Sequence, residues 1–412
     1  MPPEMRIELA DQNIYAYRFV YLALAPWCLY SVFSGGFTLR PLDGIVFASA
    51  LWMGVSFIYL YGPADGLSSG AAVALDITIP YLIARVSIRS LTDFRRYLIA
   101  ISPLVLLLAV LLPIEALTQI RFIRELSIET FGRVEANPFD IKNQTRLGML
   151  RASGPFSHPI LAGLFFAGLL PLYWFSGIRS WPRVAGLVSG FAAFFTLSSA
   201  AIIGIILFIG LALYDFLRRV VSFLNWPMFM AISVMVIAML HTASQNGLIS
   251  VILRFTFNPG TGRYRLLIWE YGSRSVAENP WFGIGFGDWT RLDWMNTSVD
   301  TFWLALAMRN GLPAAVLLGL VTLLAATGLA ISARRLRGVD QATLIGLSIA
   351  MFILFMQGFT VHFFGGLGIW FAMLLGIAVT FGFTGMQRQA MRPTSSRQPI
   401  RRPAPSRVAG IS

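Results

Sequence analysis

The chain has 412 residues, of which 56% are hydrophobic and only 12% are charged. Its mean hydropathy of +0.69 excludes an ordinary soluble domain and indicates a polytopic membrane protein. The net charge of +13 does not indicate nucleic acid as a partner. Its arginines gather at the ends of apolar runs and in the C-terminal tail, as the positive-inside rule expects.

The N-terminal half predicts helical membrane spans. MPPEMRIELADQN is polar and acidic, so we do not expect a cleavable signal peptide. Continuously apolar runs, without the two-residue alternation of a transmembrane barrel, favour helices. The predicted spans here are at about 15–36, 40–62, 70–88 and 97–117. Cys28 is the single cysteine, which excludes an internal disulfide framework and a cysteine zinc site.

Asp76 is the one clear carboxylate in the middle of a predicted span. An intramembrane acid is by default a candidate for a functional site. Arg85 and Arg89 lie further along the same span, but neither is at the i+3 or i+4 position. We therefore consider two roles for Asp76, a substrate contact or a structural pair with another helix.

A long loop at about 118–156 leads into the next span through RLGMLRASGPFSHPILAG. Arg151 precedes a Gly-Pro turn and is a candidate phosphate ligand. His158 stands directly before Pro159, at the start of the span. A lone histidine there is more often a capping or interfacial residue than a ligand, and we keep both interpretations.

The remaining apolar runs predict seven further spans. The total is eleven, with the N-terminus outside, or ten if residues 15–36 only dip into the bilayer, within a range of about 10–12. The run between Arg183 and Arg219 is too long for one span, and we divide it at TLSS, residues 196–199, where small polar residues allow a break. Asp215 has Arg218 and Arg219 at i+3 and i+4, which predicts a surface ion pair. The seven spans are at about 157–177, 184–198, 199–217, 225–242, 311–331, 343–361 and 366–385.

A second long loop, at about 243–300, contains GTGRYRLLIWEYG. The helical period places Arg263, Glu270 and Arg274 on one face. We expect Arg263 to start this helix, where exposed backbone N–H groups and a guanidinium together suit a phosphate. The alternative is an amphipathic helix on the membrane surface, with arginines at the level of the head groups.

Two further stretches of the second loop deserve a prediction. In AENPWFGIGFGDW, Pro280 is expected to stop the helix and the glycines to form a tight, close-packed turn. In NTSVDTFWLALAMRNGLP, Asp300 directly precedes an apolar helix. Its position favours a helix cap, and a general base or an orienting carboxylate is the functional alternative.

The arginine distribution predicts an orientation. Arg-rich ends near residues 89–96, 179–183, 218–219 and 334–337 face the cytoplasm. The two long loops, a short loop at residues 63–69 and the turn at His362 face the other side. Residues 386–412 carry six arginines among Pro, Ser and Gln and predict a disordered basic cytoplasmic tail that contacts anionic lipid. Residues 1–385 are expected to form one integral-membrane domain.

Four segments in this order resemble the O-antigen ligase/polymerase superfamily of bacterial membrane glycosyltransferases. They are RASGPFSHPILAG, the break TLSSA, TGRYRLLIWE with NPWFGIGFG, and DTFWLALAMRNGLP. The resemblance covers about 40–380. It implies a GT-C-like all-α architecture, in the bacterial inner membrane, acting at the periplasmic face on glycans carried by undecaprenyl pyrophosphate.

Two departures favour the exopolysaccharide polymerase branch of this family. Asp300 occupies the position at which typical ligases of this family have a histidine. Ser198-Ser199 replaces the Ser-Arg that is frequent in the family at the break between the two spans. A ligase with a lipid or protein acceptor and a polysaccharide flippase remain the alternatives.

The resemblance and the residues together predict a site without metal or cofactor. Arg263 stabilises the pyrophosphate and Asp300 is the candidate base. Membrane lipids and other polysaccharide biosynthesis or export proteins are further candidate partners. The substrate-binding candidates are Arg151, Arg274, Glu270, His158 and Asp76.

Overall fold

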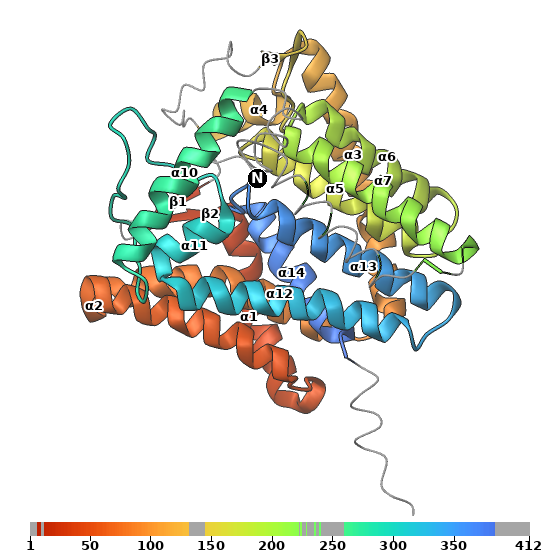
Figure 1. The fold of residues 1–412 in the computed structure, drawn as a ribbon, viewed down its shortest axis with the longest axis horizontal. Coiled ribbons are helices and arrows are strands. Elements are labelled where there is room, and N and C mark those ends of the chain that lie inside the picture. Colours follow the sequence, from red (N-terminus) through yellow and green to blue (C-terminus); the bar gives the residue numbers. More distant parts are fainter. Residues whose placement is uncertain are drawn as a thin grey trace, which may run out of the picture.

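The computed structural model describes residues 6–9, 12–131, 145–221 and 259–383, and single positions between residues 223 and 239. Its elements form an all-α polytopic membrane protein (Figure 1), as the composition predicts. Five helices in this part of the chain are long and apolar enough to cross a membrane. The predicted span at 225–242, residues 132–144 and 240–258, and the basic tail lie outside the described residues.

The helices are α1 (Ala16–Ser31), α2 (Pro41–Ser87), α3 (Leu91–Thr118), α4 (Phe122–Phe131), α5 (Pro159–Phe175), α6 (Trp181–Ala192), α7 (Ser199–Val220), α10 (Pro259–Glu278), α11 (Phe302–Asn310), α12 (Leu312–Ala333), α13 (Gly338–Gln357) and α14 (Gly366–Phe381). Two short hairpins accompany them, β1 (Arg6–Leu9) with β2 (Gln12–Tyr15) and β3 (Thr145–Arg146) with β4 (Met149–Leu150). A π-helical turn, Val32–Gly36, ends the first predicted span.

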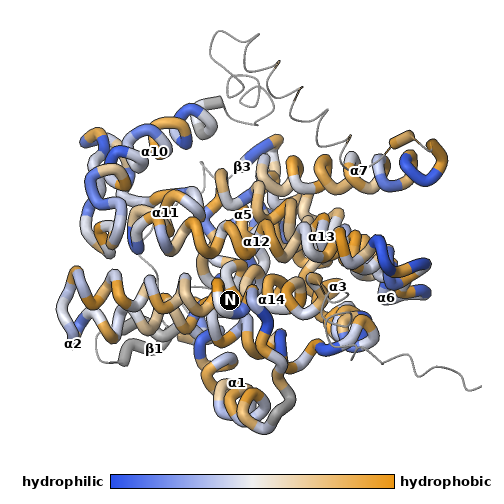
Figure 2. Tube along the Cα trace, turned by 60° about the horizontal axis from the view of Figure 1, so that its bottom comes forward, coloured by the Kyte–Doolittle hydropathy of each residue, from blue (hydrophilic) through white to orange (hydrophobic). Residues whose placement is uncertain are grey.

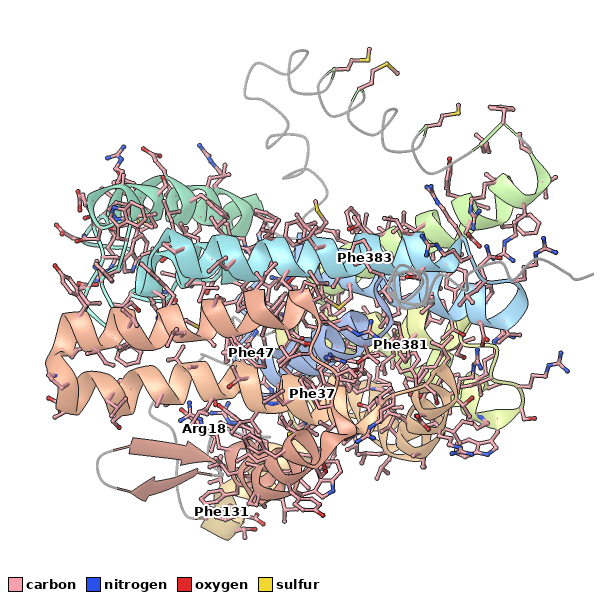
Figure 3. The ribbon with its side chains drawn as sticks, turned by 90° about the horizontal axis from the view of Figure 1, so that it is seen from below. Arg18, Phe37, Phe47, Phe131, Phe381 and Phe383 are labelled. Atoms are coloured by element: carbon pink, nitrogen blue, oxygen red, sulfur yellow. The ribbon has the colours of Figure 1, made fainter. Side chains whose placement is uncertain are left out.

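α2 is a helical hairpin made of the two spans predicted at 40–62 and 70–88. The chain reverses at Gly62, whose φ of 80° suits glycine, and Pro63 opens the second arm. No separate loop follows, in contrast to the loop expected at 63–69. The arms lie antiparallel (Figure 3), and they pack closely because Gly66 and Gly70 have no side chain where they meet Phe57 of the first arm.

α5 lies at the centre of the bundle. Nearly all of its side chains are buried, and it packs against α6, α7 and α13. It has 17 residues, and α14, which is also largely buried, has 16. Both are shorter than the roughly 20 residues that a lipid-facing span needs, because neighbouring helices rather than lipid surround them.

The break predicted at residues 196–199 is confirmed. α6 ends at Ala192, a 3-10 turn covers Ala193–Thr196, and Leu197 adopts a left-handed φ of 47° before α7 begins at Ser199. The ion pair of Asp215 with Arg218 is also confirmed, at 2.8 Å between Oδ1 and Nε. The carboxylate is buried, however, and not at the surface as expected, because the apolar face of α7 packs against the bundle.

The connections leave two sets of helix ends. One set contains the end of α3 and the starts of α5, α11 and α14, and the other contains the arginine-rich turns after α2, α5 and α12. Figure 2 shows hydrophilic positions along α10 and again near the ends of α6 and α13, with hydrophobic positions between them. A second, smaller core joins α10, α11 and the loop between them through Ile268, Trp289 and Leu304.

Candidate functional site

A cavity of about 510 Å³ lies among the first set of helix ends. Its walls come from the link after α3, the turn before α5, α10, the segment before α11 and the turn between α13 and α14. The lining residues that carry charge or can titrate near neutral pH are Arg121, Arg124, Arg265, Asp300, His158 and His362. The rest of the described lining consists of serines, glycines, Asn296, Thr360, the rings of Tyr15, Tyr17, Phe156, Tyr264 and Phe364, and the apolar residues Pro159, Ile160, Leu161 and Val361.

Arg265 enters the cavity from the inner face of α10, beside the buried Ile268. Its Nε is buried and has no hydrogen-bond partner among the described residues. Burial lowers the pKa of Arg265, and the charge of Asp300 opposes this shift. A guanidinium remains charged in protein sites, so the cavity presents a desolvated cation with capacity to bind an anion.

Arg121 follows Gln119, a left-handed residue that ends α3, and Arg124 lies one helical turn further, in α4. The Nη2 group of Arg121 donates to the backbone carbonyl of Arg151, at 3.3 Å. Burial, with repulsion from Arg124, lowers the pKa of Arg121, and the charge of Glu115 opposes this shift. The end of α3 therefore contributes positive charge to the wall opposite α10.

Arg151 is buried behind the cavity and is not part of its lining. Burial, with repulsion from Arg146, Arg121 and Arg265, lowers its pKa to about 9. The turn that follows is anchored by Glu115, whose Oε2 accepts from the N–H groups of Ser153 and Gly154 at 3.0 and 2.9 Å. Arg151 therefore adds positive potential to a site that other arginines contact.

Asp300 is the one carboxylate in the described lining. Burial raises its pKa, while Arg265 lowers it. It does not cap α11. Thr301 occupies the cap position, without a side-chain cap bond, and the N–H of Phe302 donates to the carbonyls of Gly358 and Val361, at 2.8 and 3.1 Å. The turn after α13 thus satisfies the start of α11, which leaves the Asp300 side chain available at the cavity.

His158 has the capping role that its sequence position suggested, and it also faces the cavity. It is the N-cap of α5, where its Nδ1 accepts from the N–H of Ile160 at 3.1 Å, and it lines the cavity. Burial, with repulsion from Arg151 and the other arginines, lowers its pKa to about 3. The pKa of His362 is also about 3, through burial and Arg309. Both imidazoles are therefore neutral at pH 7.

Arg263, Glu270 and Arg274 lie on one face of α10, as the helical period predicted, and all three are exposed outside the cavity lining. Arg274 Nη2 pairs with Glu270 Oε1 at 2.7 Å. The prediction that Arg263 starts the helix is wrong, because α10 begins at Pro259, a residue well suited to the first helical turn.

Asp76 lies outside the cavity lining, in the second arm of α2. Arg18 of α1 donates to both of its carboxylate oxygens, at 3.0 and 2.6 Å, and Tyr21 donates a further bond. Figure 3 shows Arg18 between α1 and this arm. The structural pair with another helix, one of the two roles considered for Asp76, is the arrangement observed.

The tight turn predicted around the glycines is confirmed. α10 ends at Glu278, and the N–H groups of Ile284 and Gly285 donate to the carbonyls of Met308 and Arg309, at 2.7 and 3.0 Å. Gly283 and Gly285 have φ of 68° and 61°. This turn ties the loop to the end of α11.

Arg121, Arg124, Arg265 and His362 were not assigned to a site from the sequence. A signal existed for Arg265, because it interrupts the apolar face of α10 that Ile268 and Trp269 define. Arg121, Arg124 and His362 carried no comparable signal, since their segments are distant from Arg265 in the chain. In the described part of the chain no three His, Cys, Asp or Glu side chains gather as metal ligands would.

The comparison with protein families identifies one match. The model of the O-antigen ligase family, Wzy_C, matches residues 184–319, which run from α6 into α12 and include Arg265 and Asp300. A comparison with curated proteins finds no match. The match of residues 184–319 to the O-antigen ligase family therefore supports the resemblance of the chain to the O-antigen ligase/polymerase superfamily of membrane glycosyltransferases.

Proposed function

We propose that the protein polymerises glycan units carried on undecaprenyl pyrophosphate, at the periplasmic face of the bacterial inner membrane. The observation that carries this proposal is the cavity in which Arg121, Arg124 and Arg265 face a single described carboxylate, Asp300. One carboxylate cannot neutralise three guanidinium groups, so the cavity suits a substrate that carries negative charge.

The arginines would bind the pyrophosphate of the donor. Guanidinium groups bind phosphate oxygens in pairs and remain charged when buried. Arg265 is the first candidate, because it lines the cavity and its buried Nε lacks a hydrogen-bond partner among the described residues. Arg263, the candidate from the sequence, lies two residues away on the exposed face, so substitutions at the two positions separate these assignments.

Asp300 would accept the proton of the acceptor hydroxyl. The hydroxyl oxygen forms a bond to the anomeric carbon of the donor sugar, and the bond between that carbon and the phosphate oxygen breaks. The electron pair leaves on the pyrophosphate, whose charge the arginines stabilise. The products are a glycan extended through the new linkage and undecaprenyl pyrophosphate, and direct displacement inverts the anomeric centre.

The position of the cavity supports the periplasmic side. It lies at the helix ends opposite the turns that carry Arg89, Arg179 and Arg334, and such turns face the cytoplasm under the positive-inside rule. Ligases of the family that the chain resembles have a histidine at the position of Asp300. This difference favours polymerisation over transfer to a lipid or protein acceptor.

Reconstitution in proteoliposomes with a lipid-linked repeat unit tests the proposal. Arg265→Gln should lower the transfer rate about 100-fold or more, since removing one donor to a developing anion has that effect. Arg96→Gln is the control, because its side chain is 78% exposed near the other set of helix ends. Full activity of Arg265→Gln at normal protein level would refute the phosphate site, and transfer to lipid A core or protein instead of glycan would favour the ligase.

A further inference from the structure

A second cavity, of about 340 Å³, lies on the other side of the segment that precedes α11. The glycine turn after α10, residues 284–289, forms one wall, and Ala305, Met308 and Arg309 of α11 form another. Figure 1 shows the loop between α10 and α11 at the edge of the molecule, beside both helices.

The segment from Asn296 to Asp300 is a partition between the two cavities. Asn296, Ser298 and Asp300 line the first cavity, whereas Thr297 and Val299 line the second. Residues 296–300 belong to no helix or strand, and their side chains alternate between the two cavities, as successive side chains do when the backbone is not helical. The two cavities are therefore adjacent, and Asp300 lies in the wall between them.

The second cavity combines an exposed aromatic ring with polar groups. Phe286 is 60% exposed, although its ring packs against Phe57 with centroids 4.9 Å apart. Trp289 is held by the bond from its Nε1 to the carbonyl of Thr297, at 3.0 Å. A fixed aromatic face beside hydrogen-bonding groups suits a ligand that has an apolar face and a polar rim.

Arg309 adds a cation to this cavity. Its guanidinium lies over the ring of Phe286, 5.8 Å from the centroid, and it forms no ion pair within the described residues. Asp288, the carboxylate of the lining, pairs instead with Arg291, at 2.9 Å between Nη2 and Oδ2. Arg309 is thus available for hydroxyl or carboxylate groups of a ligand.

We propose that the second cavity binds saccharide residues of the glycan chain that lie beyond the reacting sugar. A sugar ring has the apolar face and hydroxyl rim that this lining fits, and a lipid tail would leave the guanidinium of Arg309 without a polar partner. Asp300 precedes α11, which begins at Phe302, and Arg309 is in the last turn of this helix, about 10 Å from Phe302 along the helix axis. This inference rests on the proposed function, because it gives the growing chain a place beside the transfer site.

The side chains of Asn296 to Asp300 alternate between the two cavities, and this alternation allows each cavity to be blocked separately. Thr297→Phe would fill the second cavity, and Ser298→Phe, one residue later, would fill the first. Asp293→Phe is the control, since Asp293 is exposed in the same loop and lines neither cavity. Each variant is assayed in proteoliposomes with the lipid-linked repeat unit, by the rate of the first addition and by the chain length of the product.

We expect Thr297→Phe to retain the first addition within about twofold and to shorten the product, and Ser298→Phe to abolish transfer. Arg309→Gln should shorten the product as well, without adding bulk. Full-length product from Thr297→Phe and Arg309→Gln, with Ser298→Phe inactive, would overturn the saccharide subsite and leave the proposed function intact. Loss of the first addition in Thr297→Phe, with protein level and melting temperature equal to those of the control, would overturn the separation of the two cavities. Full activity of Ser298→Phe would refute the transfer site itself.

Discussion

Substitution of Asp300 by Asn tests the general-base role directly. Asn keeps the size and hydrogen-bonding capacity of the side chain but cannot accept a proton. General-base catalysis contributes about 10²- to 10⁴-fold, so Asp300→Asn should lower the transfer rate by that factor. Substrate affinity should change little, because the described cationic side chains of the cavity remain in place.

The pH dependence of the transfer rate is a second measurement that tests the general-base role of Asp300. A base acts only when deprotonated, and burial raises the pKa of Asp300 above its ordinary value. As the pH decreases, the rate of the parent protein should therefore fall with a midpoint above about 3.9, which is the pKa of a solvated aspartate. Arg265 lowers the pKa of Asp300, so the residual activity of Arg265→Gln should fall at a still higher pH.

The assay is initial-rate transfer in proteoliposomes across a pH series, with Asp293→Asn as the matched control in the same exposed loop. An Asp300→Asn protein that transfers at the parental rate would refute the base role. A loss of activity in Asp300→Asn, with a parental pH profile that does not move in Arg265→Gln, would instead assign Asp300 to orienting the acceptor.

Three further predictions concern the arginine site and the bundle. Arg265→Ala should remove transfer activity while Arg263→Ala retains it, and the opposite result in the same assay would restore the sequence-based assignment. Asp43→Asn should destabilise the bundle by about 3–5 kcal/mol, because the buried guanidinium of Arg85, which is 3% exposed, loses the anion that pairs with it. Thermal unfolding in detergent measures this loss, and a melting temperature equal to that of the parent would contradict the prediction. Gly311→Ala should lower the yield of folded protein, because the φ of Gly311 is 82° and a Cβ there would overlap the backbone carbonyl of Trp281. A yield equal to that of the parent in size-exclusion chromatography would contradict this prediction.

Much of the membrane architecture could be predicted from local patterns. Continuous apolar runs predicted the two arms of α2, the break before α7, and α12 to α14, because a span needs a contiguous stretch of apolar residues. The glycine turn before Gly285 and the cap at His158 were also predictable, since turn and cap chemistry depend on a few neighbouring residues. Four segments in order carried the resemblance to the O-antigen ligase family, and the range that matches the family model, residues 184–319, contains three of them.

The site itself depends on contacts between distant segments. The period of α10 placed Arg263 with Glu270 and Arg274 correctly on one face, but which face meets the cavity depends on how α10 packs against α11. Arg121 and His362 join Arg265 only because the end of α3 and the turn after α13 meet at the same end of the bundle.

What the amino-acid sequence determines alone is thus the membrane class and most of the described spans, because each depends on composition or on residues close in the chain. The resemblance to the O-antigen ligase family and the orientation that the arginines predict depend on the same local patterns. The tertiary structure decides which arginines face the first cavity, that Asp76 pairs with Arg18, and that Asn296 to Asp300 divides two cavities. These features depend on packing between segments far apart in the chain, and no local pattern encodes such contacts.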